Sequence, residues 1–414
     1  MSVMSVPDGS WVNCTTSHRH IDRRPIRTLR VVNSATMGDD VETQLDLSRH
    51  SMVDLFAGPG GLDVAAVWVG LAAHGIEWDA EANATRRNAQ LETTEGDVRA
   101  YGPALHDAAT ILSGGPPCQT FTVAGTGSGR KALGHIGHLV GQMANDKDIT
   151  ASLKVLEDER SGLILQPLKW ILGAMDAGHP YEAVVLEQVQ AALPIWTAMK
   201  PVLEALGYHV ICTVLRTEMF GVPQTRRRAV LLANLRTQPI TPEPTHQAYR
   251  IGTARLPQGN TEPRPWVSMN DALARPEWFE VISNYGSGGN PAARGRRTCE
   301  QPSATVTGKV SRNRLVDRNG RPLPRLTAGE AGALQTFPDD YPWDLSGWAQ
   351  QVGNAIPPRL GVHLLAAVFG CVPDQATLDA RVAAPWTPES QPAVVLVHPQ
   401  RRLADANLFD AQPV

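Results

Sequence analysis

The sequence predicts an α/β protein with a mixed, mostly parallel sheet covered by helices on both faces. From residue 51 onward, short β-like apolar runs alternate with helix-like segments, which is the pattern of strand–helix units. Glycine-rich or polar turns follow several of these runs, and no internal repeat breaks the alternation. With 414 residues, the chain has room for two domains or for one large elaborated domain.

The expected strands are short apolar runs, and most of the expected helices lie between them. Strands are expected at 52–56, 109–113, 183–186, 209–215 and 229–233. Helices are expected at 62–69, 81–90, 163–177, 195–206, 327–336 and 358–369. Ligands of open α/β sheets bind beyond the carboxyl ends of the strands, so polar residues directly after the strands are candidates for a site.

Composition changes along the chain and divides it into segments. Residues 1–50 are polar and without a period, and we expect a flexible leader. Residues 51–235 and 326–372 carry the α/β pattern and form two parts of one domain. Residues 236–325 are rich in Pro, Gly, Asn and Arg and are expected to form a small irregular domain. Residues 373–414 are rich in Pro, Ala and Gln and are expected to form a peripheral extension.

Composition excludes several classes of protein. Hydrophobic residues make up 42% and charged residues 19%, which excludes a chain that is disordered throughout. The charge-free apolar stretch 64–76 has 13 residues, fewer than the ~20 that span a bilayer, and we find no signal-peptide pattern. The five cysteines are far apart and form neither a disulfide framework nor a metal-binding pattern. We therefore expect a cytoplasmic protein with no metal and no membrane attachment.

Charge is unevenly distributed along the chain. The formal net charge is −3, but residues 236–325 contain 14 Lys and Arg against 7 Asp and Glu, a net of +7. A basic segment on an acidic body can mark a polyanion site, although an arginine-rich loop region would have the same composition.

Three early motifs suggest a nucleoside site. Residues 54–62 form a strand, a glycine-rich turn and the start of a helix, but Pro59 disfavours a dinucleotide pyrophosphate site. Glu77 and Trp78 stand at the expected end of the second strand, where an acid can bind ribose hydroxyls and an aromatic ring can stack on a purine. Asp97 follows the third strand and can accept from an adenine amine. An exposed acid or a packing tryptophan is the alternative for each residue alone.

The later motifs suggest nucleophilic chemistry. Cys118 lies behind two prolines and before a glycine-rich loop, where a thiol is polar and accessible rather than buried and inert. Glu187 ends a buried strand, and a carboxyl there is costly unless it is used, for example as an acid with a raised pKa. Gln224, Arg226 and Arg228 can place three donors on one face, or form a surface basic patch.

In this order and spacing, the motifs resemble those of the DNA (cytosine-5) methyltransferase family, of the bacterial or phage type. The resemblance covers nearly all of residues 51–372. Besides the residues above, it rests on Pro117-Cys118-Gln119, Glu187-Gln188-Val189, the segment 325–339 and the Gln-Val-Gly-Asn motif at 351–354. It implies a Rossmann-like S-adenosylmethionine-dependent methyltransferase domain, with residues 236–325 as the target-recognition domain.

The resemblance also implies roles for four catalytic residues. The thiolate of Cys118 would add to carbon 6 of a flipped cytosine and make carbon 5 nucleophilic. Glu187 would protonate or hydrogen-bond nitrogen 3. Arg228 would hold the ring carbonyl, and Arg226 would support nearby charge. Carbon 5 would then take the methyl group from S-adenosylmethionine.

The implied ligands are S-adenosylmethionine and double-stranded DNA. The residues implied to hold the cofactor are Phe56, Ala57, Gly58, Gly60, Gly61, Leu62, Glu77, Trp78, Asp97, Val98, Pro117, Asn354 and Ala355. The candidate DNA contacts are Gln119, Arg294, Arg296, Arg297, Thr305, Arg312 and Arg314. A restriction endonuclease is a candidate partner, in restriction-modification or phage DNA protection, and we expect a monomer.

Two departures from the family pattern leave questions open. Gln188 stands where the family usually has Asn, so its hold on the catalytic loop is open. The segment between Cys118 and Asp158 is longer than in typical members and is expected to extend an active-site lid, at about 124–157. The alternatives are a tRNA cytosine-5 methyltransferase of the same fold and a catalytically silent DNA-binding homologue. A nucleotide-dependent oxidoreductase fits Pro59 and Cys118 less well.

Overall fold

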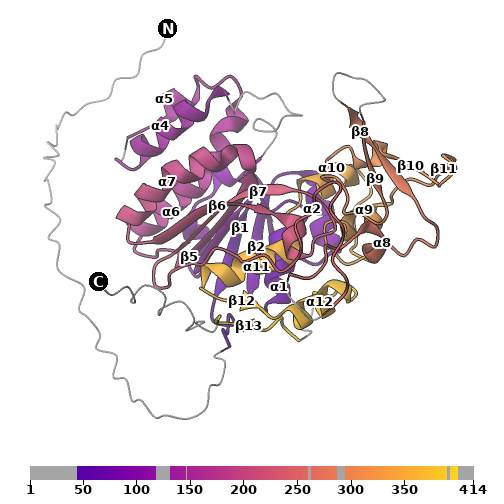
Figure 1. Ribbon diagram of the computed structural model, residues 1–414. Coiled ribbons are helices and arrows are strands. Elements are labelled where there is room, and N and C mark those ends of the chain that lie inside the picture. Colours follow the sequence, from indigo (N-terminus) through magenta and orange to yellow (C-terminus); the bar gives the residue numbers. More distant parts are fainter. Residues whose placement is uncertain are drawn as a thin grey trace, which may run out of the picture. The chain divides into compact units, whose positions relative to one another are not determined.

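The computed structural model describes residues 44–117, 131–145, 147–259, 263–286, 294–388 and 392–399 (Figure 1). All of these belong to one compact unit, Glu42–Val414. In the described residues, no helix is long and apolar enough to cross a membrane, and no group of His, Cys, Asp and Glu side chains is arranged to hold a metal ion.

A seven-stranded sheet forms the centre of the fold, in the order β3-β2-β1-β4-β5-β7-β6. Its strands are β1 (Ser51–Leu55), β2 (Ala72–Glu77), β3 (Thr93–Glu95), β4 (Ile111–Gly114), β5 (Ala183–Val189), β6 (His209–Arg216) and β7 (Arg227–Asn234). The pairs from β3 to β5 are parallel, whereas β7 runs antiparallel to both β5 and β6. The predicted mixed, mostly parallel α/β fold is therefore confirmed.

Helices cover both faces of this sheet, as Figure 1 shows. One face carries α1 (Gly61–Trp68) and α11 (Pro358–Val368), and the other carries α4 (Leu133–Met143), α6 (Gln166–Asp176) and α7 (Leu193–Ala205). Neighbouring residues of β1 divide between the two cores, since Met52 packs on the first face and Val53 on the second. Burial on both faces explains why these strands are continuous apolar runs in the sequence.

Shorter elements complete the domain. They are α2 (Ala80–Asn88), α5 (Thr150–Leu153), α9 (Ala328–Ala333) and α10 (Trp348–Asn354). Thr327 caps α9 through a reciprocal capping box with Glu330, which fixes where that helix begins.

The segment 236–325 is more regular than we expected. It contains a second, antiparallel sheet in the order β11-β10-β8-β9, with α8 (Met269–Ala272) beside it. The strands are β8 (Glu280–Gly286), β9 (Arg294–Thr298), β10 (Arg314–Val316) and β11 (Pro322–Leu323). The polar sequence of β9, Arg-Gly-Arg-Arg-Thr, hides its strand character, because little of it is buried.

Helix α4 corrects the expectation of a lid at about 124–157. Ile136, Leu139 and Val140 are at most 1% exposed and pack in the core with α7, a spacing that gives a helix one apolar face. Residues from Leu133 to Met143 are therefore part of the core rather than of a lid. Residues 118–130 lie outside the described residues.

The described part of the C-terminal segment, residues 373–388 and 392–399, packs on the domain instead of lying at its periphery, which is a second correction. Helix α12 (Gln375–Ala383) buries Leu378, and β12 (Val372–Pro373) pairs with β13 (Leu396–Val397). The end of the expected leader joins the same region, because the backbone N–H of Leu45 donates to the carbonyl of Leu396 at 2.9 Å and Leu47 is buried. Both segments complete the core against α1 and α11.

Candidate active site

A cavity of about 360 Å³ opens at the carboxyl edge of the central sheet. Of the residues expected to hold the cofactor, all except Gly60 line it. Glu187, Arg226 and Arg228 line the same cavity, so residues of seven separate sequence motifs meet there. Its volume is in the range of small-molecule sites.

The glycine-rich turn between β1 and α1 forms one wall. Phe56 and Gly58 both have left-handed backbone conformations, with φ of 59° and 56°. A side chain on Gly58 would enter open space, so a ligand can approach the backbone there. A Cβ on Gly61 would lie 2.2 Å from the carbonyl oxygen of Ile356, so this glycine allows the late Gln-Val-Gly-Asn region to pack against the turn.

Gly60 stands behind this wall instead of lining the cavity. Its φ is 105°, and a Cβ there would lie 2.3 Å from Leu91 and 3.0 Å from the hydroxyl of Tyr341. The expected cofactor contact of Gly60 stays a prediction, whereas the structure gives glycine a packing reason at this position, together with a left-handed backbone.

Glu77 holds the turn in place from the end of β2. Its carboxylate accepts hydrogen bonds from the backbone N–H groups of Gly58 (2.7 Å), Trp78 (2.9 Å) and Asp79 (2.7 Å). Burial raises the pKa of Glu77, and the three donors oppose that rise. Oε1 accepts from both Trp78 and Asp79, whereas Oε2 accepts only from Gly58 and keeps an acceptor site for a ligand hydroxyl.

Trp78 and Asp97 offer the remaining expected nucleoside contacts. The Trp78 side chain is 68% exposed at the cavity, which is unusual for a large aromatic residue and leaves its ring face free for stacking. Asp97 pairs with Arg99 at 2.6 Å, and this hydrogen bonding lowers the pKa of Asp97. Its carboxylate is therefore ionised and able to accept from an amine.

Glu187 and Arg228 form a buried ion pair on the other side of the cavity. The antiparallel pairing of β5 with β7 aligns Val189 with Arg228, and this register brings the two side chains together. Burial raises the pKa of Glu187, while Arg228 and then Arg226 act to lower it. A carboxyl in this setting keeps its proton at a higher pH than usual and can serve as an acid.

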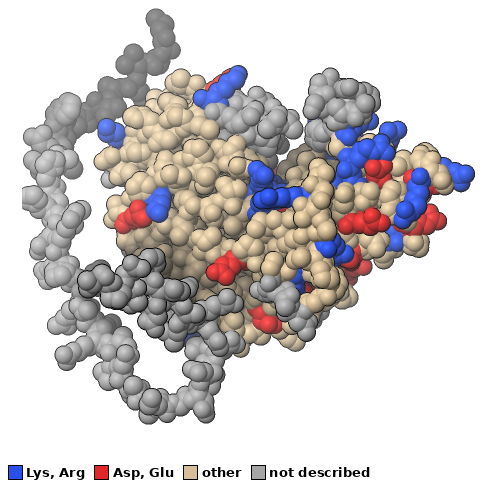
Figure 2. Space-filling view, in the orientation of Figure 1, with Lys and Arg blue, Asp and Glu red and all other residues tan. Residues whose placement is uncertain are grey.

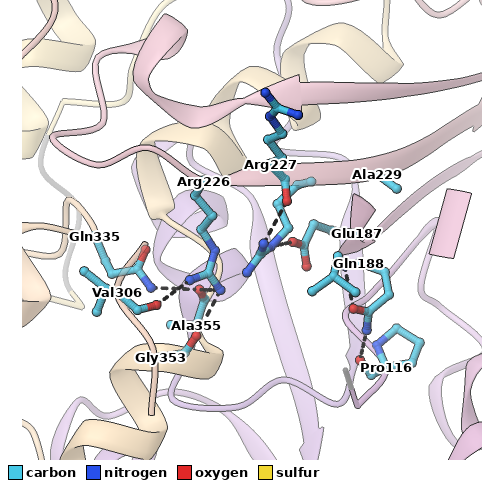
Figure 3. Close-up of polar contacts among 12 residues, drawn as sticks. Pro116, Glu187, Gln188, Arg226, Arg227, Ala229, Val306, Gln335, Gly353 and Ala355 are labelled. Atoms are coloured by element: carbon cyan, nitrogen blue, oxygen red, sulfur yellow. Dashed lines mark hydrogen bonds and ion pairs between the residues drawn. The ribbon is translucent and has the colours of Figure 1, made fainter. Parts of the chain in front are cut away.

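Arg226 connects three segments of the chain. Its guanidinium donates to the backbone carbonyls of Val306 (2.8 Å), Gly353 (2.9 Å) and Ala355 (3.3 Å), as Figure 3 shows. It thereby joins the segment 236–325 and the late Gln-Val-Gly-Asn motif to the start of β7. These contacts make Arg226 a positioning residue at the wall of the cavity.

The amide of Gln188 reaches the loop that follows β4. Its Nε2 donates to the carbonyl of Pro116, and its Oε1 accepts from the N–H of Val189 at 2.5 Å (Figure 3). Pro117 lines the cavity directly after this anchor. Cys118 and Gln119 lie outside the described residues, so their predicted roles are not tested by the structure.

The expected DNA contacts fall into two groups. Arg297 and Thr305 line a second hollow next to the cavity, whereas the other described candidates, Arg294, Arg296, Arg312 and Arg314, do not. The Arg296 guanidinium pairs with Glu280. Lys and Arg side chains gather over the β8–β11 sheet, as Figure 2 shows.

Sequence reasoning missed three arginines of the second hollow. Arg216, Arg227 and Arg250 line it beside Arg297. Arg216 and Arg227 stand at the facing ends of β6 and β7, and only the pairing of those strands shows that they are neighbours. The sequence signal available was their position after or before a predicted strand.

The sheet with an antiparallel β7, the glycine-rich turn and the buried acid–arginine pair define an α/β enzyme of the Rossmann-like methyltransferase class. A mutant form of DNMT2 from Spodoptera frugiperda has the same fold, with a TM-score of 0.52 at 13% identity, over 77% of this chain and 99% of that one.

Residues 50–136 and 186–370 match the model of the family described as C-5 cytosine-specific DNA methylase, so the chain belongs to this family of DNA cytosine-5 methyltransferases. Type II methyltransferase M1.HphI of Haemophilus parahaemolyticus is 28% identical over 298 residues, which are 67% of this chain and 73% of that protein. Type II methyltransferase M.AplI of Arthrospira platensis is 26% identical over 342 residues, 80% of this chain and 87% of that protein.

Proposed function

We propose that this enzyme transfers a methyl group from S-adenosylmethionine to carbon 5 of a flipped cytosine in a short sequence of double-stranded DNA. The single observation that carries the proposal is the buried Glu187–Arg228 pair, which shares one cavity with the glycine-rich turn and Pro117. The residues proposed to hold the cofactor and the carboxyl proposed to protonate the cytosine therefore line the same cavity.

The residues of the first wall fit S-adenosylmethionine. Glu77 offers an acceptor site for a ribose hydroxyl, Trp78 a free ring face for adenine, and Asp97 an ionised acceptor for its amine. Gly58 leaves its backbone open to the ligand. When bound, S-adenosylmethionine supplies an electrophilic methyl group.

The second wall fits a cytosine ring. Burial raises the pKa of Glu187, which favours the protonated carboxyl, and in that form it can donate to ring nitrogen 3. Arg228 lies against this carboxyl and is placed to donate to the neighbouring ring carbonyl. Together they withdraw electrons from the ring when the Cys118 thiolate adds to carbon 6, and carbon 5 becomes nucleophilic. Once carbon 5 has taken the methyl group, a base removes the carbon 5 proton, and the electron pair of that bond expels the Cys118 thiolate and restores the aromatic ring.

The DNA strand must deliver its base out of the helix, because carbon 5 cannot be reached inside a duplex. Unpairing costs a few kcal/mol, which contacts to phosphates and to the partner base offset. The basic target-recognition segment supports this role. The Type II names of the relatives support a place in restriction-modification, with a cognate endonuclease as partner.

Bisulfite sequencing tests the proposal directly. The full chain is expressed in cells without cytosine methylation, beside Cys118→Ala and the control Cys212→Ala, whose thiol lies away from the cavity and donates to the Trp196 carbonyl. Wild type and Cys212→Ala should protect cytosine at one short motif, and Cys118→Ala should protect none. Unmodified DNA, from a folded wild type that binds S-adenosylmethionine, would refute DNA as the substrate and direct the assay to RNA.

A further inference from the structure

Helix α12 lies beyond the part of the chain that matches the family model, which ends at residue 370. The helix carries one acid, Asp379, and the two oxygens of this carboxylate pair with arginines from two different segments. Oδ1 lies 2.6 Å from Arg359 of α11, and Oδ2 lies 2.7 Å from Arg264 of the segment 236–325. We call these three residues the carboxylate clamp. One carboxylate thereby joins the C-terminal helix to both parts of the enzyme.

The clamp depends on the negative charge of Asp379. Burial acts to raise the pKa of Asp379, but Arg359 and Arg264 outweigh it and lower this pKa, so the carboxylate is ionised. Burial lowers the pKa of the neighbouring His246 to about 3, with a further contribution from both arginines, so the imidazole adds no third positive charge. The Arg359 side chain is only 4% exposed, and a buried guanidinium needs a counter-charge.

The first arm of the clamp runs from Arg359 to the arginine motif at the start of β7. A short 3-10 helix, η5 (Thr217–Phe220), precedes that motif, and the Nε of Arg359 donates to its last carbonyl at 2.7 Å. The first residue of η5 donates through its N–H to the carbonyl of Arg226 and through its hydroxyl to that of Gln224, both at 2.9 Å. A Cβ on Gly221 would lie 2.6 Å from the Nε of Arg359, so glycine makes room for the guanidinium.

The second arm runs from Arg264 through the backbone of the target-recognition segment. The N–H of Arg264 donates to the carbonyl of Thr245 at 2.9 Å, and its carbonyl accepts from the N–H of Gln247 at 2.7 Å. The N–H of Thr245 in turn donates to the carbonyl of Met219 at 2.9 Å, inside η5. The two arms therefore meet on successive residues of η5, and Asp379 closes the loop between them.

We propose that Asp379 is a positioning residue for methyl transfer, which acts through Arg359 and Arg264 on η5 and on the target-recognition segment. The first arm serves the chemical step, because Arg228 must meet the cytosine ring beside Glu187, and a small displacement of such a group costs rate. The second arm serves DNA affinity, because it fixes the segment that is expected to contact DNA. This inference rests on the proposed function, since it names a residue that supports the same site.

Single-turnover methylation and DNA-binding measurements separate the two arms. Arg264→Gln removes only the second arm, from a side chain that is 32% exposed, and leaves Asp379 on Arg359. It should weaken DNA binding about three- to tenfold and keep the single-turnover rate within about twofold of wild type. Asp379→Asn removes both arms and should also lower the single-turnover rate, by about tenfold. Asp379→Glu keeps a carboxylate and should restore most of both quantities.

Two further measurements distinguish these effects from a loss of folded protein. Active sites are counted by covalent trapping on a duplex with 5-fluorocytosine at the target, and S-adenosylmethionine affinity, measured by calorimetry, should stay constant. Glu204→Gln is the matched control. It alters a helical carboxylate of α7 that is 49% exposed, against 45% for Asp379, and that pairs with Lys200 at 3.7 Å. This variant should match wild type in both rate and DNA affinity.

The outcomes separate this inference from the proposed function. If wild type methylates DNA and Asp379→Asn keeps its rate and DNA affinity, the inference is overturned and the proposed function stands. Equal defects in Asp379→Asn and Asp379→Glu would also overturn it, because the carboxylate would then not be the group that matters. If Asp379→Asn yields no folded protein, Arg264→Gln decides, and wild-type DNA affinity in that variant refutes the inference. If wild type methylates no DNA, the proposed function fails, and the inference with it.

Discussion

Gln188 joins the strand that carries the proposed acid, Glu187, to the loop that leads to Cys118, so removing its amide should slow catalysis without affecting cofactor binding. The side chain is 2% exposed and uses both ends of its amide, one on Pro116 and one on Val189. Gln188→Ala deletes both hydrogen bonds and leaves the Pro116 carbonyl without this donor, two residues before the nucleophile.

The structure sets the size of the expected effect. An unsatisfied buried group costs about 1–3 kcal/mol, and the loop carbonyl can recover part of this by turning to water. A shift of the loop away from its reactive position costs rate rather than cofactor affinity. We expect kcat/KM for DNA to fall about 10- to 100-fold, which corresponds to ~1.4–2.7 kcal/mol of lost transition-state stabilisation. Gln188→Asn keeps an amide but is one methylene shorter, and its effect should be intermediate.

Trapping the covalent adduct isolates the step involved. A duplex with 5-fluorocytosine at the target blocks elimination, so the rate of adduct formation reports attack by Cys118. This rate should fall with kcat/KM in Gln188→Ala, while S-adenosylmethionine affinity, measured by calorimetry, stays constant. Gln190→Ala is the matched control, since that glutamine is exposed just beyond β5. Adduct formation within twofold of wild type in Gln188→Ala would refute the reasoning.

Three further predictions concern other parts of the molecule. Burial raises the pKa of Glu187, so its proton is lost only as pH rises above the usual carboxyl range. The pH–rate profile of kcat/KM should therefore have an alkaline limb that falls through that pKa. Glu187→Gln should lower kcat/KM about 10²- to 10⁴-fold and abolish this limb. Arg86→Met leaves the buried Asp63 carboxylate without its bidentate partner at 2.8 and 2.9 Å. The free energy of unfolding, measured in urea, should fall by about 3–5 kcal/mol. Adding Asp63→Leu to the same chain should restore most of this loss. Trp386→Ala removes a ring 5.3 Å from Tyr341, whose hydroxyl donates to the Pro59 carbonyl of the cofactor turn, and should weaken S-adenosylmethionine binding about two- to tenfold by calorimetry.

Each of these three has an outcome that contradicts it. An unchanged alkaline limb in Glu187→Gln would assign that titration to another group. A loss under 1 kcal/mol in Arg86→Met would mean that the Asp63 site admits water or takes up a proton. Equal cofactor affinity in Trp386→Ala would show that the C-terminal segment does not support the turn.

The residues of the cofactor wall were predictable because they lie close together in the sequence. A glycine-rich turn, an acid at the end of the next strand and another after the third strand are local signals, and a parallel sheet brings such strand ends to one edge. Their exact tasks were not predictable. Glu77 accepts from one backbone amide of the turn, that of Gly58, and from two amides after β2, and Gly60 packs behind the turn. Both roles depend on what approaches from other elements.

Packing roles outside the motifs could not be predicted for a similar reason. The helix α4 looked like part of a lid because it follows the nucleophile, but its apolar face at Ile136 and Leu139 packs with α7. The C-terminal segment looked peripheral from its composition, yet Leu378 and Leu396 complete the core. In both cases, the decisive partner is distant in the sequence.

The sequence by itself determined the α/β class, the order of the motifs and most of the residues that meet in the cavity, because periodicity and residue chemistry are local properties. The tertiary structure decided how the Glu187 carboxyl is tuned and which arginines lie beside it. The antiparallel placement of β7 between β5 and β6 brings Arg228 to Glu187 and Arg227 to the second hollow. These contacts join residues far apart in the chain, and their energies depend on burial and register, which exist only after the sheet has formed.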